Sequence, residues 1–353
     1  MNRLTVVVLA ALLATACQRQ QAAGPQADKA GDAVWVAGSS TVFPFATRVS
    51  ENVARLTGNK PARVESLGTG GGIKLFCSGL GAKAPDIATA SRQMKKSEWD
   101  ACVGAGVNEI IELKVGYDGI VIANAKGGKI YDVTREQIFR ALAAELPAGA
   151  GFAPNTTATW ADVNPSLPKD KILVYGPPPT SGTRDAFAEL ALEAGARKLP
   201  ALEALRASDE DAFKQRAHRT RGDGAWVDAG ENDNAIVQTL TKTPGSLGVF
   251  GYSFLENNSD TVKAASVEGV APTLAAISNG SYPLSRSLYI YVKKANFAVK
   301  PGLREYVQAF VSDAASGKGG YLIERGLIPL PDAERLTQQA HAKDQQVMAA
   351  PEK

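Results

Sequence analysis

The stretch Val34-Trp35-Val36-Ala37-Gly38-Ser39-Ser40-Thr41-Val42-Phe43-Pro44 joins a short apolar run to a segment with helical spacing. Residues 34–37 are typical of a buried β-strand. Residues 44–57 carry apolar side chains three or four positions apart and end before a glycine, which predicts an amphipathic helix. The small hydroxyl residues between them therefore lie where a strand gives way to a helix.

The same succession of strand and helix recurs along the chain. Further strands are predicted at residues 63–67, 86–90, 109–115, 119–123, 172–175 and 288–292, and further helices at 72–77, 95–103, 131–146, 184–196, 234–241 and 302–316. Residues 147–159 are predicted to form a loop, and residues 197–230 are polar with no clear period. This alternation predicts an α/β fold with a mostly parallel sheet.

The N-terminal residues predict export from the cell. A basic start is followed by an apolar run of about a dozen residues, whereas a bilayer-spanning helix needs about 20. The run ends in Leu13-Ala14-Thr15-Ala16-Cys17, which resembles a bacterial lipobox. We predict a lipoprotein signal peptide at residues 1–17 and a periplasmic protein anchored to the membrane only through lipidated Cys17. The alternative is an ordinary cleaved signal that contains a cysteine.

The remaining composition limits the function further. Residues 18–33 are rich in Gln, Ala and Gly and are predicted to be a linker. About 320 residues follow, which is enough for two domains. The net charge of +3 gives no reason to expect a nucleic-acid partner. The two histidines, His218 and His341, are too few for most metal sites, and we predict no cofactor.

Two cysteines are left if Cys17 carries lipid. Cys77 and Cys102 form an even pair in an exported chain, which predicts a disulfide because the periplasm is oxidising. Closing a loop of about 25 residues would stabilise the fold by about 3 kcal/mol. The alternative is a pair of buried free thiols.

Glycine and hydroxyl residues follow four of the predicted strands. The four segments are Gly38-Ser39-Ser40-Thr41, Gly68-Thr69-Gly70-Gly71-Gly72, Ser91-Arg92 and Thr180-Ser181-Gly182-Thr183. The first turn of a helix has unpaired amides and roughly half a positive charge, which attracts anions. Each segment alone is equally explained as a helix N-cap. The four together predict one site for a tetrahedral oxyanion.

Other phosphate and hydrolase chemistries fit the sequence poorly. None of these segments has the Gly-Lys-Ser/Thr spacing of a nucleotide-binding loop. No nucleophile-elbow sequence appears, and neither histidine lies in a triad-like setting. We therefore predict a binding protein without catalysis.

The ordered set of motifs resembles the PstS family, the phosphate-binding subunits of bacterial phosphate ABC transporters. The resemblance covers residues 34–311 and adds Gly230-Glu231-Asn232-Asp233-Asn234 and Gly245-Ser246-Leu247-Gly248-Val249-Phe250-Gly251-Tyr252. It implies the two-lobed type II periplasmic-binding-protein fold with two hinge crossings, near residues 116–120 and 248–252. Lobe 1 would comprise residues 34–116 and 252–345, and lobe 2 residues 117–251.

The resemblance also implies which residues hold the ligand. The matching positions are Ser40, Thr41, Thr69, Gly70, Gly71, Ser181, Gly182 and Thr183. Two positions depart from the family pattern: Ser91 stands where many relatives have Asp, and Pro177 where many have Arg. We include Ser91 in the predicted site.

The two departures leave a cation and a carboxylate to be found elsewhere. Arg92 is the first candidate for the cation and Arg221 the second, because a guanidinium suits a phosphate edge. The alternative for both is a solvated surface arginine. Asp118 and Asp223 are unranked candidates for the carboxylate that would accept the proton of hydrogen phosphate.

The function implied is high-affinity phosphate binding in a cleft between the lobes, with delivery to ABC permease subunits by a monomeric protein. Alternatives are a binding protein for sulfate or molybdate, a secreted phosphatase, and a phosphate sensor. A phosphatase would need a metal cluster or an activated nucleophile.

Overall fold

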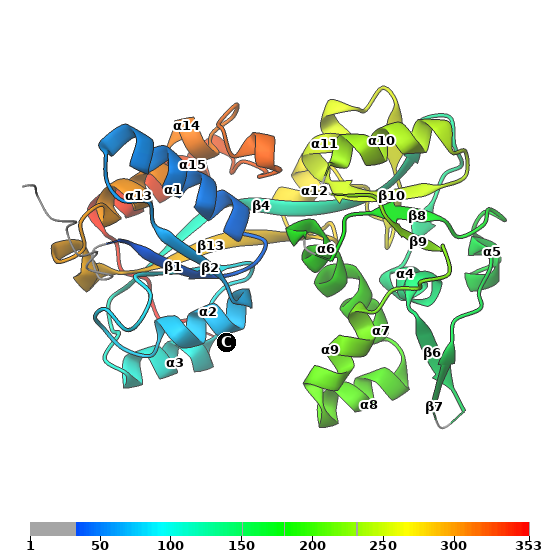
Figure 1. Ribbon diagram of the computed structural model, residues 1–353, viewed down its shortest axis with the longest axis horizontal. Coiled ribbons are helices and arrows are strands. Elements are labelled where there is room, and N and C mark those ends of the chain that lie inside the picture. The colour runs from blue at the N-terminus through cyan, green and yellow to red at the C-terminus, as the bar shows by residue number, and fades with distance from the viewer. Residues whose placement is uncertain (1–32, 150, 180, 231, 353) are drawn as a thin grey trace, which may run out of the picture. The chain divides into compact units, whose positions relative to one another are not determined.

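The computed structural model describes residues 33–149, 151–179, 181–230 and 232–352 (Figure 1). The predicted signal peptide, Cys17 and nearly all of the predicted linker lie outside these ranges, as do Thr180 and Glu231. In the part of the chain that is described, no helix has the length and apolarity that crossing a bilayer requires.

One mixed sheet runs through the described residues in the order β2-β1-β3-β13-β4-β10-β8-β9, with β11 also paired to β4. The strands are β1 (Trp35–Gly38), β2 (Arg63–Ser66), β3 (Ile87–Ala90), β4 (Ile110–Ala125), β8 (Val174–Gly176), β9 (Trp226–Asp228), β10 (Leu247–Gly251), β11 (Val262–Ala264) and β13 (Ser285–Lys293). β1 pairs in parallel with β2 and β3, and β8 with β9 and β10. The predicted α/β fold is confirmed.

Strand β4 belongs to both halves of this sheet. Its first part pairs with β13, and its last residues pair with β10 and β11. The two strands predicted at residues 109–115 and 119–123 are therefore one continuous strand. Gly116 lies inside it with φ 159°, and a Cβ at this position would stand 2.6 Å from Leu327 Cδ1. Residues 116–120, predicted as the first lobe crossing, lie within β4.

The structure places the second crossing later in the chain than residues 248–252. Gly248 to Gly251 pair with Ala123 to Ile120, within the second lobe. The residues that follow remain in the hydrophobic core of that lobe, as far as Tyr282 and Leu284. The chain returns along β13, and we therefore extend lobe 2 to about residue 284. The motif from Gly245 to Tyr252 contains β10, an internal strand of lobe 2.

Helices cover both faces of the strands in the first lobe (Figure 1). They are α1 (Phe43–Thr57), α2 (Gly68–Phe76), α3 (Lys96–Gly104), α13 (Leu303–Phe310), α14 (Asp313–Ser316) and α15 (Asp332–Asp344), with short turns η2 (Lys294–Ala298) and η3 (Ile323–Arg325). Ile87 and Ile290 pack with α1 and α13, whereas their neighbours Ala88 and Tyr291 pack with α2 and α3. Alternate residues of a strand point to opposite faces, which separates these two cores.

Cys77 and Cys102 are disulfide-bonded, as predicted. The bond joins the residue that ends α2 to helix α3. The start of α2 is thereby held on a short element that is covalently attached to its neighbour.

The second lobe packs one hydrophobic core around β8, β10 and the last part of β4. Its other elements are β5 (Asp132–Val133), α4 (Arg135–Leu142), β6 (Glu145–Ala148), β7 (Gly151–Pro154), α5 (Trp160–Val163), α6 (Gly182–Phe187), η1 (Ala188–Glu193), α7 (Ala194–Ala196), α8 (Pro200–Ser208), α9 (Glu210–His218), α10 (Asp233–Lys242), α11 (Tyr252–Asn257), β12 (Ser266–Val267) and α12 (Leu274–Ser278). Elements α6, η1 and α7 follow one another without a break.

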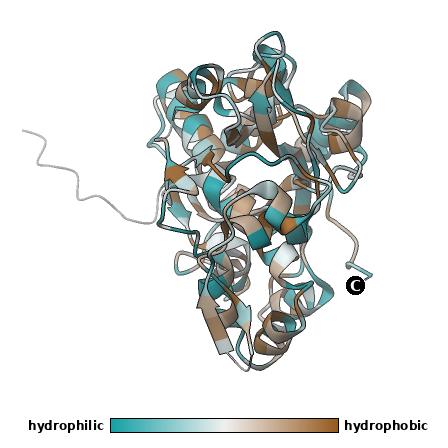
Figure 2. Cartoon of the chain, turned by 90° about the vertical axis from the view of Figure 1, so that its right-hand side faces the viewer, coloured by the Kyte–Doolittle hydropathy of each residue, from teal (hydrophilic) through white to brown (hydrophobic). Residues whose placement is uncertain are grey.

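Two second-lobe segments differ from the sequence prediction. Residues 197–230 contain helices α8 and α9, which bury Leu202 and Phe213 among charged neighbours. Residues 147–159, predicted as a loop, contribute to the hairpin of β6 and β7. Figure 2 shows hydrophilic and hydrophobic residues mixed along the helices, so the average polarity of a segment conceals its buried face.

Candidate functional site

The turn after β1 forms the first wall of the candidate site. Ser39 donates its amide to Thr89 O at 2.9 Å, and Phe43 donates to Ser39 O at 3.0 Å. These bonds fix the turn while the amides of Ser40 and Thr41 meet no acceptor among the described residues. Two unpaired amides and two hydroxyls at a strand end can solvate an anion.

Helix α2 begins directly beside this turn, earlier than predicted. It starts at Gly68, so the glycine-rich segment is the first turn of the helix and not a loop before it. Close packing is possible because Gly72 has no side chain: a Cβ there would lie 2.2 Å from Gly38 Cα. Gly70 and Gly71 are exposed at this helix start, where the amides lack internal partners.

Thr69 and Ser91 meet at the same sheet edge. The Thr69 hydroxyl accepts the Ser91 amide at 3.0 Å, and the two hydroxyl oxygens are 3.0 Å apart. β2, β1 and β3 are parallel neighbours, so the segments after them lie together. The structure therefore brings the first three predicted segments to one place.

Arg92 lies next to the start of α2 but is already paired. Its guanidinium donates to both carboxylate oxygens of Glu98, at 2.7 and 2.9 Å. The hydrogen bond with Glu98 is the main reason that the pKa of Arg92 is raised. A Cβ on Gly70 would lie 4.0 Å from Arg92 Nη2, so this cation stands beside the predicted anion-binding turn.

The second lobe supplies the opposite wall from the start of α6. Ser181 is the N-cap of this helix and accepts the Thr183 amide at 3.2 Å. A Cβ on Gly182 would lie 3.2 Å from Ser40 O and 3.5 Å from Thr41 Cα. The two turns, from different lobes, therefore face each other at close range.

A cavity of about 590 Å³ opens between these two turns. Its wall includes five of the predicted ligand residues, Ser40, Thr41, Ser181, Gly182 and Thr183, together with Asp118. Farther along, the wall is formed by other residues, among them Asp233, Phe254, Glu324 and Arg325. Thr69, Gly70, Gly71, Ser91 and Arg92 are not part of this wall in the structure.

Arg286 of β13, which the sequence analysis did not identify, contacts two residues of the cavity wall. Its Nη2 donates to Thr41 Oγ1 at 2.5 Å, and its Nε lies 3.4 Å from Asp118 Oδ2. The side chains of Arg286 and Asp118 are 10% and 12% exposed, so this ion pair is largely shielded from water. Burial raises the pKa of Asp118, and the positive charge of Arg286 opposes that rise.

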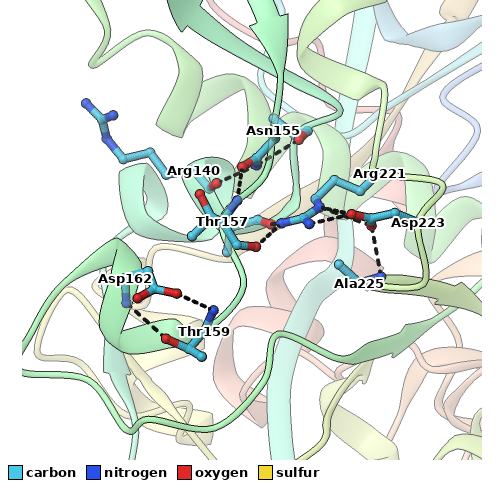
Figure 3. A network of polar contacts seen from close by, with 10 residues as sticks. Arg140, Asn155, Thr157, Thr159, Asp162, Arg221, Asp223 and Ala225 are labelled. Carbon is cyan, nitrogen blue, oxygen red and sulfur yellow. Dashed lines mark hydrogen bonds and ion pairs between the residues drawn. The ribbon is translucent and has the colours of Figure 1, made fainter.

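Arg221 is engaged elsewhere in lobe 2. It donates to Asp223 Oδ2 at 2.5 Å and to the carbonyl oxygen of Thr157 (Figure 3). It also donates to the carbonyl oxygen of Ala141. Asp223 is its ion-pair partner and not a wall residue of the cavity. We therefore remove Arg221 and Asp223 from the candidate site.

Sequence comparisons find one matching family model and several related proteins. A family model described as a PBP superfamily domain matches residues 22–314. Phosphate-binding protein PstS of Staphylococcus saprophyticus is 30% identical over 87% of this chain and 83% of its own length. The chain belongs to the PstS family. Protein SphX of Synechococcus elongatus, another relative of this PstS-family chain, is 32% identical over 83% of the chain and 76% of its own length.

Solved structures resemble this PstS-family chain in their fold. The crystal structure described as a possible phosphate binding protein from Planctomyces limnophilus matches with a TM-score of 0.71 and 27% identity, over 89% of this chain and 98% of that one. An ABC-type phosphate transport receptor from Vibrio cholerae matches with a TM-score of 0.55 at 20% identity, over 84% and 100%. The second likeness concerns the fold alone.

Proposed function

We propose that this protein binds inorganic phosphate in the cavity between its lobes and delivers it to an ABC permease. The observation that carries the proposal is the meeting of the Ser40-Thr41 turn and the start of α6 across one cavity. Free amides, hydroxyls and a helix start can surround a small anion with hydrogen bonds, with little formal charge.

Arg286 supplies the cation in this proposal. The family positions that many relatives use are Ser91 and Pro177 here, and neither side chain is charged. Arg286 is buried, is held by Thr41 and borders the cavity through Thr41 and Asp118. A guanidinium at this place can bind two oxygens of one phosphate. Arg92 remains a second candidate after lobe closure, because it stands beside Gly70.

Asp118 discriminates between phosphate and sulfate. Hydrogen phosphate can donate its proton to a carboxylate, whereas sulfate has no proton and would face only repulsion. Asp118 lines the cavity and Asp223 does not, which ranks the two carboxylates that the sequence left open. The ion pair with Arg286 favours the ionised form of Asp118, which can accept a proton, whereas burial raises the pKa of Asp118.

The proposal also covers lobe closure, delivery to the permease and the location of the protein in the cell. Hinge movement about β4 and β13 would close the lobes on phosphate and present the closed form to the permease. The N-terminal sequence supports export to the periplasm, with Cys17 as lipid anchor and the remainder as a monomeric binding protein. Family membership favours transport over catalysis, and a turnover assay with a phosphate monoester tests the phosphatase alternative directly.

Calorimetric titration of the soluble chain from residue 18 tests the proposal. We expect one phosphate per chain, and competition by arsenate but not by equal concentrations of sulfate at pH 8. Molybdate belongs in the same series. Binding of sulfate or molybdate in preference to phosphate would overturn the assignment of the ligand, and hydrolysis of the ester would overturn the non-catalytic function.

A further inference from the structure

Glu189 reaches from the second lobe to the buried cation of the first. It lies in η1, which continues the helix that begins at Gly182, and its Oε2 pairs with Arg286 Nη1. Arg286 shares its other donors between Thr41 and Asp118. One guanidinium therefore joins Thr41 of the first lobe and Asp118 of the crossing strand β4 to a carboxylate of the second lobe.

The negative charge of Glu189 also raises the pKa of two other residues of the candidate site. Burial is the main reason that the pKa of Asp118 is raised, and Glu189 adds to the rise. The hydrogen bond to Glu98 dominates the raised pKa of Arg92, and Glu189 again contributes. The charge of Glu189 therefore acts on Arg286, Arg92 and Asp118.

The burial of the Arg286 guanidinium explains why it needs a carboxylate partner. The Arg286 side chain is 10% exposed, and a buried cation is costly unless hydrogen-bond acceptors surround it. Asp118 Oδ2 lies 3.4 Å from Arg286 Nε, which is a long hydrogen bond, whereas the carboxylate of Glu189 lies closer to the guanidinium. Glu189 itself is 48% exposed, so its carboxylate can leave for water at low cost.

We propose that Glu189 occupies the place of the ligand's charge on Arg286 in the phosphate-free protein, so that phosphate must displace it. This inference rests on the proposed phosphate-binding function. Glu189 is an internal competitor that lowers the affinity for phosphate. It also ties the lobes together without ligand, because it reaches from the second lobe to Arg286 of β13, and it returns to Arg286 when phosphate leaves.

The Glu189→Gln variant tests the competition. Gln keeps the shape of the side chain and removes its charge, and Glu203→Gln is the matched control because Glu203 pairs with Arg206 on α8, away from Arg286. We expect calorimetry to give at least fivefold tighter phosphate binding for Glu189→Gln, and a change of less than twofold for Glu203→Gln. An affinity for Glu189→Gln that is unchanged or weaker than wild type overturns the inference while the proposed function stands.

Failure of the proposed function gives a different result. In that case neither the wild-type protein nor Glu189→Gln binds phosphate, although both fold with the same circular dichroism spectrum. Binding by Glu189→Gln alone would support both statements, because it would show that Glu189 masks the site.

Small-angle X-ray scattering tests the tie between the lobes independently of affinity. Without phosphate, we expect a larger radius of gyration for Glu189→Gln than for the wild type and for Glu203→Gln. With saturating phosphate, the three proteins should have the same radius. Equal radii without phosphate would overturn the tie between the lobes.

Discussion

Replacing Gly72 by alanine tests whether the close contact between α2 and β1 builds the first wall of the site. The added Cβ would lie 2.2 Å from Gly38 Cα and 2.8 Å from Ala37 O, whereas ordinary contacts begin at 3.4 Å. Both of these atoms belong to the backbone, so no side chain can turn away. The helix has to move by about 1 Å or more relative to the strand.

The expected losses of stability and of phosphate affinity follow from a comparison with Gly71→Ala on the same helix. A Cβ on Gly71 meets only Leu67 Cβ, at an ordinary 3.5 Å. Both substitutions gain about 1 kcal/mol of helix propensity, which cancels between them. Overpacking then makes Gly72→Ala about 1–3 kcal/mol less stable than Gly71→Ala. The displaced Thr69 hydroxyl should also cost about tenfold in phosphate affinity, the value of one charge-assisted hydrogen bond.

Urea unfolding gives the free energies of unfolding of the two variants, and calorimetry gives their phosphate affinities. Gly71→Ala keeps its backbone amide, and its added methyl group makes only an ordinary van der Waals contact. We therefore expect this variant to bind phosphate within about threefold of the wild type. Equal stability and equal affinity of the two variants would refute the reasoning, because the contact between α2 and β1 would then have no bearing on the site.

Four further predictions concern the candidate site, the disulfide and Arg221, which lies outside the site. Thr183→Ala should weaken phosphate binding by about 1.5–3 kcal/mol in calorimetry, and an unchanged affinity would exclude its hydroxyl as a ligand. Sulfate should compete better with phosphate as the pH falls, because burial raises the pKa of Asp118 and the protonated carboxyl no longer repels sulfate. The Asp118→Asn variant should bind sulfate equally well at every pH. A pH-dependent inhibition constant of sulfate in that variant would contradict the role of Asp118. The Cys77→Ala, Cys102→Ala double variant should lose about 3 kcal/mol of stability in urea unfolding and keep its phosphate affinity, so weaker binding would show that the bond also positions α2. Arg221→Met should lower the melting temperature without changing phosphate affinity, so weaker binding would return Arg221 to the site.

The local part of the site could be read from the sequence. The strand ending at Gly38, the turn at Ser40 and Thr41, and the N-cap at Ser181 each depend on a few neighbouring residues. Parallel pairing of adjacent strands then brings such turns to one sheet edge. The contact between Thr69 and Ser91 follows from this rule.

The charged part of the site could not be read in this way. Arg286 and Asp118 are 168 residues apart and meet because antiparallel pairing of β13 with β4 sets them opposite each other. No local pattern around Ser285-Arg286 distinguishes this arginine from a surface residue. The second crossing was misplaced for a similar reason, since β10 and β13 both carry apolar β patterns and only long-range pairing separates their roles.

Crystals grown with arsenate test the central claim most directly, because the anomalous scattering of arsenic locates the anion without assumptions about hydrogen bonds. We expect one anomalous peak per chain, between the Ser40-Thr41 turn and the start of α6, within hydrogen-bonding distance of the Thr41 and Thr183 hydroxyls and the Arg286 guanidinium. A peak bound to one lobe alone, or at a position remote from these three groups, would contradict the account.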